Sequence, residues 1–356
     1  MYKRDFIQLV RLGVGCTADD LSQSINWSKI RAVAACHGLS AIVLDGVERL
    51  STRLAPPKAF LLQWIGEVLQ RERTYSVKQE STIKLAKLFH ENAIRTYELK
   101  GGVVSECYPK PDHRPSVDLD CFLLPVGGDF DAWELANDLI RTRGYKVNCD
   151  FYKNSTFVLP GLTVENHKYM TPFRGNKRLE RLEKLLQSLI REDKGENKME
   201  SIWIYRPPVM LTSLFLIEHA YSHFLHEGLT WRHVLDWMMF SRKHKDEIEW
   251  DLLNKWIDEY GFRRFYDSFY RLGQYLLGDI DIVDLTKRDR KMLKDVWADL
   301  DLHETLHGVK GKLSLAGNTW RARWKYHYFS EISMLHALWI QVKCFLFIRE
   351  VDKICG

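Results

Sequence analysis

The sequence predicts an α+β fold in which a small mixed β-sheet core is flanked by an N-terminal helical region and a large C-terminal helical region. Short apolar runs with a period of two gather between residues 94 and 169. Apolar residues at three- and four-residue spacing, typical of helices, fill the chain on either side. The 356 residues are 46% hydrophobic, enough for several packed cores. We expect the three regions to cover residues 1–95, 96–174 and 175–356.

The first region is expected to be a helical scaffold. Asn26 precedes an apolar run and suits a helix N-cap, and Gly38 suits the end of that helix. Pro56 and Pro57 mark a boundary. Beyond them, residues 60–89 carry apolar side chains at helical spacing, as expected of long helices that pack on a sheet.

The centre of the predicted sheet is the run SVDLDCFLL over residues 116–124, whose apolar and acidic residues alternate as in a strand. Asp118 and Asp120 therefore point from one face. Two neighbouring carboxylates repel each other unless a cation compensates them, and Mg²⁺ prefers carboxylate and phosphate oxygens. The alternative is a polar strand face that meets solvent. Phe122 continues that face, however, and the run is too apolar for an exposed edge.

A glycine turn precedes this strand. Residues 94–99 are predicted to form a strand that ends at Lys100, Gly101 and Gly102, and a short helix is predicted over 103–108. Glycines at such a turn allow backbone amides to approach a phosphate closely. The sequence thus predicts a phosphate site beside a metal site.

This order of elements resembles the DNA polymerase β-like nucleotidyltransferase superfamily, whose signature is a glycine turn, a helix and a strand with two alternating acidic residues. In more detail, the chain is similar to an uncharacterised bacterial nucleotidyltransferase family of that superfamily. The insert PKPDHRPS lengthens the usual gap before the first Asp, and its three prolines predict a rigid loop. The matching residues are Leu99, Lys100, Gly101, Tyr108, Pro109, Arg114, Asp118 and Asp120.

After the Asp strand we expect a helix and three further strands. The last strand carries Glu165 and His167 two residues apart, and therefore on one face. The superfamily resemblance implies a third carboxylate beside the first two, and Glu165 is the well-placed candidate. The alternative is a Glu165 that faces solvent. The helix is predicted over residues 131–142 and the strands over 145–149, 155–159 and 162–169.

The most informative predicted helix of the third region covers residues 209–227. Its apolar stripe leaves His219, His223 and His226 on the opposite side. Three interpretations remain open for these histidines: a zinc site, a seam in which imidazoles meet phosphate oxygens, or structural hydrogen bonding.

The next predicted helix, WRHVLDWMMF, places Arg232 and Asp236 four residues apart. In the phosphate interpretation Arg232 joins the histidines at the nucleotide. In the structural interpretation Asp236 holds a histidine. The role of Arg114 is also open. Arg114 either stabilises charge on the leaving group or is held in place by Asp112.

The resemblance implies a Mg²⁺-dependent enzyme that moves an NMP from an NTP, with ATP favoured, to a hydroxyl acceptor and releases pyrophosphate. Asp118, Asp120 and Glu165 are then the catalytic residues and hold two Mg²⁺ ions. The acceptor, whether protein, RNA or small molecule, is not indicated. Two alternatives are a nucleotide-binding protein without transfer and a phosphotransferase on the same fold. The expected nucleotide-binding residues are Lys100, Gly101, Gly102, Arg114, His167, His219, His223 and Arg232.

Composition favours a cytoplasmic protein without a membrane partner. The first eight residues are interrupted by charges and do not resemble a signal peptide, and residues 334–348 contain polar side chains that argue against a membrane span. Seven scattered cysteines form no metal-ligand pairs and no disulfide framework. The net charge of +5 is compatible with binding phosphates or RNA.

Overall fold

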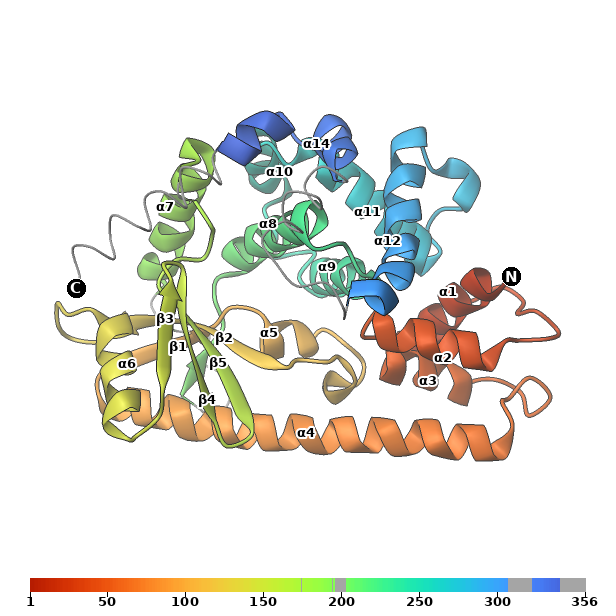
Figure 1. The fold of residues 1–356 in the computed structure, drawn as a ribbon, viewed down its shortest axis with the longest axis horizontal. Coiled ribbons are helices and arrows are strands. Elements are labelled where there is room, and N and C mark those ends of the chain that lie inside the picture. Colours follow the sequence, from red (N-terminus) through yellow and green to blue (C-terminus); the bar gives the residue numbers. More distant parts are fainter. Residues whose placement is uncertain (174, 194, 196–202, 307–321, 340–356) are drawn as a thin grey trace.

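The computed structural model has the predicted α+β class and is built around one mixed sheet (Figure 1). Six strands pair in the order β3-β4-β5-β2-β1-β6. None of the helices in the described part of the chain is long and apolar enough to cross a membrane. The structure describes the whole chain except residues 174, 194, 196–202, 307–321 and 340–356.

The N-terminal helices form a layer that reaches the sheet through one long helix. The side chain of Asn26 accepts a hydrogen bond from the Lys29 amide and caps α2, as predicted. The helical run after the two prolines is a single helix of 34 residues, α4, which passes beneath the sheet and extends to the first helices (Figure 1). The bounds are α1 (Tyr2–Gly13), α2 (Trp27–Cys36), α3 (Ser40–Glu48) and α4 (Lys58–Glu91).

The sheet places the Asp strand, β2, at its centre. β2 runs antiparallel to β1 and parallel to β5, so both of its edges are hydrogen bonded. β6 lies in the region expected to be helical and pairs with β1 through Ile204 and Tyr205. A strand of two residues is too short to show a periodicity in the sequence. The strands are β1 (Ile94–Glu98), β2 (Asp118–Pro125), β3 (Val147–Phe151), β4 (Asn154–Leu159), β5 (Leu162–His167) and β6 (Ile204–Tyr205).

Two short elements and one helix complete this part of the chain. The glycine turn leads into α5 (Gly101–Ser105), and the proline-rich insert forms the 3₁₀ turn η1 (Pro111–His113). α6 (Ala132–Thr142) covers one face of the sheet and is capped by Asp131, whose side chain accepts from the Trp133 and Glu134 amides.

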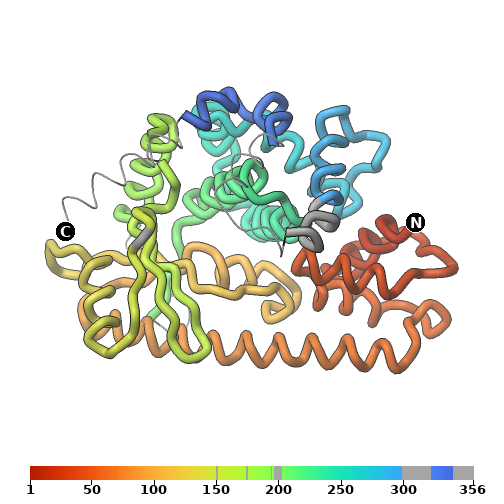
Figure 2. The backbone as a smooth tube through the Cα atoms, viewed as in Figure 1, coloured from red at the N-terminus to blue at the C-terminus, as the bar shows by residue number. Residues whose placement is uncertain are grey.

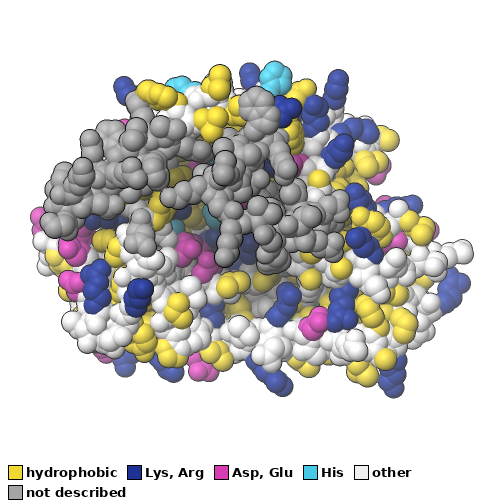
Figure 3. All heavy atoms as spheres, viewed as in Figure 1, with side chains coloured by type: hydrophobic (Ala, Val, Ile, Leu, Met, Phe, Trp, Pro, Cys, Tyr) yellow, Lys and Arg dark blue, Asp and Glu magenta, His cyan; other side chains and the backbone are white. Residues whose placement is uncertain are grey.

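The C-terminal helices pack around α8 (Figure 2). Most residues of α8 are buried. Apolar residues of α8 and α9 join those of the N-terminal helices in one large core. On the face drawn in Figure 3, basic side chains are scattered among acidic ones over the described surface. The helices are α7 (Lys177–Glu192), α8 (Val209–His226), α9 (Trp231–Lys243), α10 (Trp250–Glu259), α11 (Arg263–Leu277), α12 (Lys287–Leu306) and α14 (Arg323–Phe329).

Candidate active site

The register of two parallel strands brings the predicted acidic residues together. Asp120 on β2 lies opposite Glu165 on β5, and Phe122 lies opposite His167. Because side chains alternate along a strand, Asp120, Glu165 and His167 project from the same face, and Asp118 precedes them on that face. Strand pairing alone thus gathers three polar side chains at the centre of the sheet.

His167 lies between the two carboxylates. Its Nε2 is 3.2 Å from Oδ1 of Asp120 and 3.6 Å from Oε2 of Glu165. Burial alone would lower the pKa of His167, but the hydrogen bonds to Asp120 and Glu165 raise it above its ordinary value. Asn154 on β4 donates its amide to Glu165 Oε2 at 3.2 Å. Glu165 is therefore oriented from two sides.

Lys100 supplies a second positive charge. Its Nζ lies 3.1 Å from Asp120 Oδ2 and 3.3 Å from His219 Nε2. Although burial alone would raise it, the Lys100 and His167 charges hold the pKa of Asp120 well below its usual range. The Lys100 contact is an ion pair without hydrogen-bond alignment, so the buried Oδ2 atom has no hydrogen-bond partner among the described residues.

These residues fit a divalent cation. Ligand atoms of Asp120, Glu165 and His167 lie within 4.8 Å of one another. Asp120 and Glu165 offer the oxygen ligands that Mg²⁺ prefers, and Asp120 Oδ2, which makes no hydrogen bond, would become a ligand when the Lys100 ammonium moves away. Within the described part of the chain, the Asp118 carboxylate does not belong to this group. The Asp118 side chain is half-buried and lies two residues before Asp120, on the same face of β2.

The glycine turn is shaped by a buried acid that the sequence analysis did not identify. The Gly102 amide donates to Oε1 of Glu98 at 2.6 Å, and Glu98 is 3% exposed. A Cβ atom on Gly101 would lie 2.2 Å from Glu98 Oε1, and one on Gly102 would lie 2.6 Å from Glu98 Oε2. Burial raises the pKa of Glu98. Both glycines are thus required by a close contact behind the turn.

A buried lysine, also not predicted, holds the start of β2. Lys78 reaches from α4 to the Asp118 carbonyl oxygen at 2.6 Å and to the Ser116 hydroxyl. Burial lowers the pKa of Lys78. Because the contact is with the Asp118 backbone, the long helix under the sheet fixes the strand while leaving the Asp118 side chain free of it.

Arg114 is held by Asp236 on α9, and the expected alternative, a pair with Asp112, is wrong. Its Nε and Nη2 atoms donate to the Asp236 carboxylate at 3.0 and 2.7 Å, and its Nη1 atom donates to the Gly101 carbonyl oxygen at 3.2 Å. Tyr108 donates its hydroxyl to Asp236 at 2.7 Å. Arg114 is only 1% exposed, so it supports the glycine turn from inside the protein.

The proline-rich insert is pinned to the N-terminal helices, as a rigid loop requires. His113 Nδ1 lies 2.7 Å from Asp45 on α3, and its Nε2 lies 2.9 Å from Glu72 on α4. Burial alone would lower the pKa of His113, but the two carboxylates raise it. Lys110 adds a salt bridge to Asp45. The loop before the Asp strand is therefore fixed at both ends.

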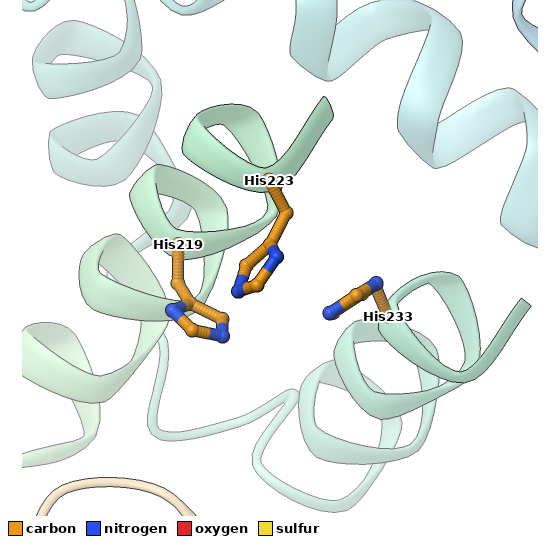
Figure 4. A group of neighbouring side chains, drawn as sticks. All are labelled: His219, His223 and His233. Atoms are coloured by element: carbon orange, nitrogen blue, oxygen red, sulfur yellow. The ribbon is translucent and has the colours of Figure 1, made fainter. Parts of the chain in front are cut away.

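The three histidines predicted on one side of α8 do not lie together. His219 and His223 on α8 turn towards α9, where they meet His233, a residue the sequence analysis did not connect with them (Figure 4). His226 instead lines a separate cavity of about 730 Å³. The suggestion that Asp236 holds a histidine is wrong, because that carboxylate is taken by Arg114 and Tyr108. Arg232 donates to the Pro115 carbonyl oxygen at 3.4 Å, which places it beside the insert.

Two acidic residues on adjacent central strands, beside a glycine turn with a lysine, agree with the arrangement that the resemblance to nucleotidyltransferases implies. A family model described as "Uncharacterised nucleotidyltransferase" matches residues 23–278, more than two thirds of the chain. The chain belongs to this family and is a nucleotidyltransferase. Neither the search of curated proteins nor that of solved structures found a match.

Proposed function

We propose that this nucleotidyltransferase moves an NMP from an NTP, with ATP favoured, to a hydroxyl acceptor and releases pyrophosphate. The observation that carries the proposal is the alignment of Asp120 with Glu165 across β2 and β5, with Lys100 at 3.1 Å from Asp120. Membership in the family supports an NTP as the donor.

Asp118, Asp120 and Glu165 are the residues that would hold two Mg²⁺ ions. Mg²⁺ bound there would neutralise phosphate charge and lower the pKa of the acceptor hydroxyl. The chain itself keeps the carboxylates of Asp120 and Glu165 ionised. The pKa of Glu165 is lowered, chiefly by its hydrogen bond with His167, and that of Asp120 is lowered by Lys100 and His167. His167 is proposed to hold the two acids in place and to face the nucleotide.

The β- and γ-phosphates are proposed to bind on the Lys100 side of the carboxylates. Lys100 has a flexible stem and a charge that can move from Asp120 to a phosphate oxygen. Three further residues are proposed to flank this side. They are His219, which contacts Lys100, its neighbour His223, and Arg232, which contacts the insert. Gly101 and Gly102 are proposed to line the phosphate site at the turn, where Glu98 holds the Gly102 amide and Arg114 holds the Gly101 carbonyl oxygen.

We propose that the acceptor is a small molecule that binds in the cavity lined by α8. At about 730 Å³ this cavity is within the range of small-molecule sites, and its lining includes Tyr152 and the buried Glu218. Burial raises the pKa of Glu218 to about 7, and the charge of Lys153, next to Tyr152, acts in the opposite direction. Tyr152 lines the cavity, and Asn154, two residues further along the chain, donates to Glu165 at 3.2 Å. This turn joins the cavity to the catalytic face, which supports an acceptor that approaches from this direction.

The test follows the label of NTPs marked at the α- or the γ-phosphate, in the presence of Mg²⁺ and a cell extract. Nucleotide transfer carries the α-label to an acceptor and releases the γ-label as pyrophosphate. Transfer of the γ-label to an acceptor would replace the proposal with a phosphotransferase. Mg²⁺-dependent nucleotide binding without any transfer would leave only a binding function. Label on a macromolecule would overturn the small-molecule acceptor.

A further inference from the structure

The cavity of about 730 Å³ beside α8 combines aromatic walls with a buried acid. Its lining comes from α7, α8, α14 and the turn between α10 and α11. Tyr260, Phe262 and Tyr326 contribute buried aromatic rings to it. Of the described residues that line the cavity, Glu218 alone is acidic. A mostly apolar wall with few polar groups is typical of small-molecule sites, in which the polar groups select the ligand.

The carboxyl group of Glu218 lacks a donor. Glu218 is 4% exposed, and no donor in the part of the chain that the structure describes forms a hydrogen bond with it. Burial raises its pKa to about 7, and the nearby charge of Glu183 acts in the same direction, while that of Lys153 acts in the opposite one. A buried carboxyl group without a donor is unfavourable. Its position on the cavity wall therefore calls for a donor from a bound molecule.

The positively charged side chains at the cavity do not neutralise this acid. Arg178 lines the cavity but forms a salt bridge with Glu331 at 2.7 Å. Lys177 and His336 also line it, and both are exposed to solvent. Burial lowers the pKa of His226, so its ring is neutral. The charge available to a ligand inside the cavity is thus negative.

We propose that this cavity binds a small organic molecule that carries a protonated amine, with the ammonium group on Glu218 and the rest of the molecule against the aromatic rings. An ammonium group supplies both the donor and the opposite charge that Glu218 lacks, and such charge-assisted hydrogen bonds are strong. The faces of tyrosine rings also attract cations. An anionic ligand would instead bring its charge against a carboxylate.

The amine names the class of the acceptor, and in this respect the inference rests on the proposed function. Tyr152 lines the cavity, and Asn154 of the same turn orients Glu165 on the catalytic face. An acceptor held by its amine at Glu218 would extend along this turn and present a hydroxyl group to the carboxylates. Binding of an amine in the cavity does not itself require transfer.

The experiment compares three ligands that share one indole body and differ in the charge of the side chain. Tryptamine carries an ammonium group, tryptophol a hydroxyl group in its place, and indole-3-propionate a carboxylate. Each is titrated calorimetrically into the full chain without nucleotide or Mg²⁺, at about pH 8, where a carboxyl group with a pKa of about 7 is mostly ionised. We expect tryptamine to bind about 10–150-fold more tightly than tryptophol, and indole-3-propionate to bind most weakly.

Glu218→Gln keeps the size of the side chain and removes its charge. Tryptamine should then bind no more tightly than tryptophol, whose affinity should stay close to the parental value. Glu180→Gln is the matched control, because Glu180 lies on α7 with a side chain 47% exposed and does not line the cavity. It should bind tryptamine like the parent protein. Circular dichroism shows whether each variant is folded, and the order of the three ligands in the parent protein is a test that needs no variant.

Three results would overturn the proposal: no tryptamine binding to the parent protein, tryptophol or indole-3-propionate binding as tightly as tryptamine, or an unchanged preference for tryptamine in Glu218→Gln. Nucleotide transfer is measured separately. Transfer without tryptamine binding would contradict the amine class and leave the proposed function intact. Tryptamine binding without any transfer would contradict the proposed function and leave the amine site intact.

Discussion

The ammonium of Lys100 lies 3.1 Å from Oδ2 of Asp120, in the position that a cation would take to neutralise this buried carboxylate. The same ammonium is 3.3 Å from Nε2 of His219. Lys100 therefore lies between the carboxylates and the histidines of α8, and a metal ion bound by the carboxylates would compete with it for Asp120 Oδ2. Binding of substrate and metals is expected to shift this one side chain.

The first prediction concerns that competition. Lys100→Gln removes a positive charge from Asp120, so the free protein should bind Mg²⁺ more tightly than the parent. At the same time the NTP loses a charged phosphate contact of about 1.5–3 kcal/mol, so kcat/KM should fall about 10–150-fold. Calorimetric Mg²⁺ titration and steady-state kinetics measure the two effects. Unchanged Mg²⁺ affinity would show that Lys100 does not occupy the metal position.

A second prediction tests the support of the glycine turn. Asp236→Asn leaves Arg114 buried without a charge partner, so the free energy of unfolding should fall by about 3–5 kcal/mol. Asp258 is the control, because it pairs with Arg263 on the surface, with a side chain 62% exposed. Asp258→Asn should cost less than about 1 kcal/mol. Urea unfolding compares the two, and equal losses would contradict a structural role for the buried pair.

The same pair predicts a pH dependence. Although burial alone would raise it, Arg114 holds the pKa of Asp236 below its ordinary value. The folded pKa is thus lower than the unfolded value of about 3.9, so the stabilisation is present above that pH and is lost as pH falls through the folded pKa. The difference in unfolding free energy between the parent and Asp236→Asn should stay constant from about pH 7 to 5 and shrink below about pH 4. A difference in unfolding free energy that grows as the pH falls would contradict this prediction.

A third substitution tests the close contact behind the glycine turn separately from the helix propensity of glycine. In Gly102→Ala the new methyl group would lie 2.6 Å from Glu98 Oε2, so the turn should shift, with loss of both stability and transfer activity. Gly66→Ala is the matched control. Gly66 lies on the exposed side of α4 with nothing within 4 Å, so alanine should stabilise the helix by about 1 kcal/mol. Thermal unfolding measures both, and two changes of the same sign would contradict the account.

The local patterns of the sequence predicted the strands and their faces well. Alternation around Asp118 and Asp120 identified β2, and the spacing of Glu165 and His167 identified the face of β5 that meets it. These features depend on residues that are close in the sequence, and the alternation of apolar and polar residues shows them directly. The class and the central strands could therefore be predicted without coordinates.

The partners that come from distant elements could not be predicted in this way. Asp236 was expected to hold a histidine but binds Arg114, 122 residues away, because only packing decides which buried charges meet. His233 lies on α9 and joins the α8 histidines through the angle between two helices, which no periodicity encodes. Lys78 and Glu98 looked like ordinary charged residues of a helix and a strand. Lys78 is buried where α4 meets the start of β2, and Glu98 is buried behind the glycine turn.

The central claim is most directly tested by transfer of α-labelled nucleotide with Mg²⁺ in the Asp120→Asn variant. The side chain keeps its size and loses its charge, so we expect a folded protein whose transfer rate falls by about 10²–10³-fold or more. Asp118→Asn should show a similar loss, while Asp258→Asn should transfer like the parent. Asp120→Asn protein that transfers the label at the parental rate would contradict the assignment of the carboxylates as the catalytic centre.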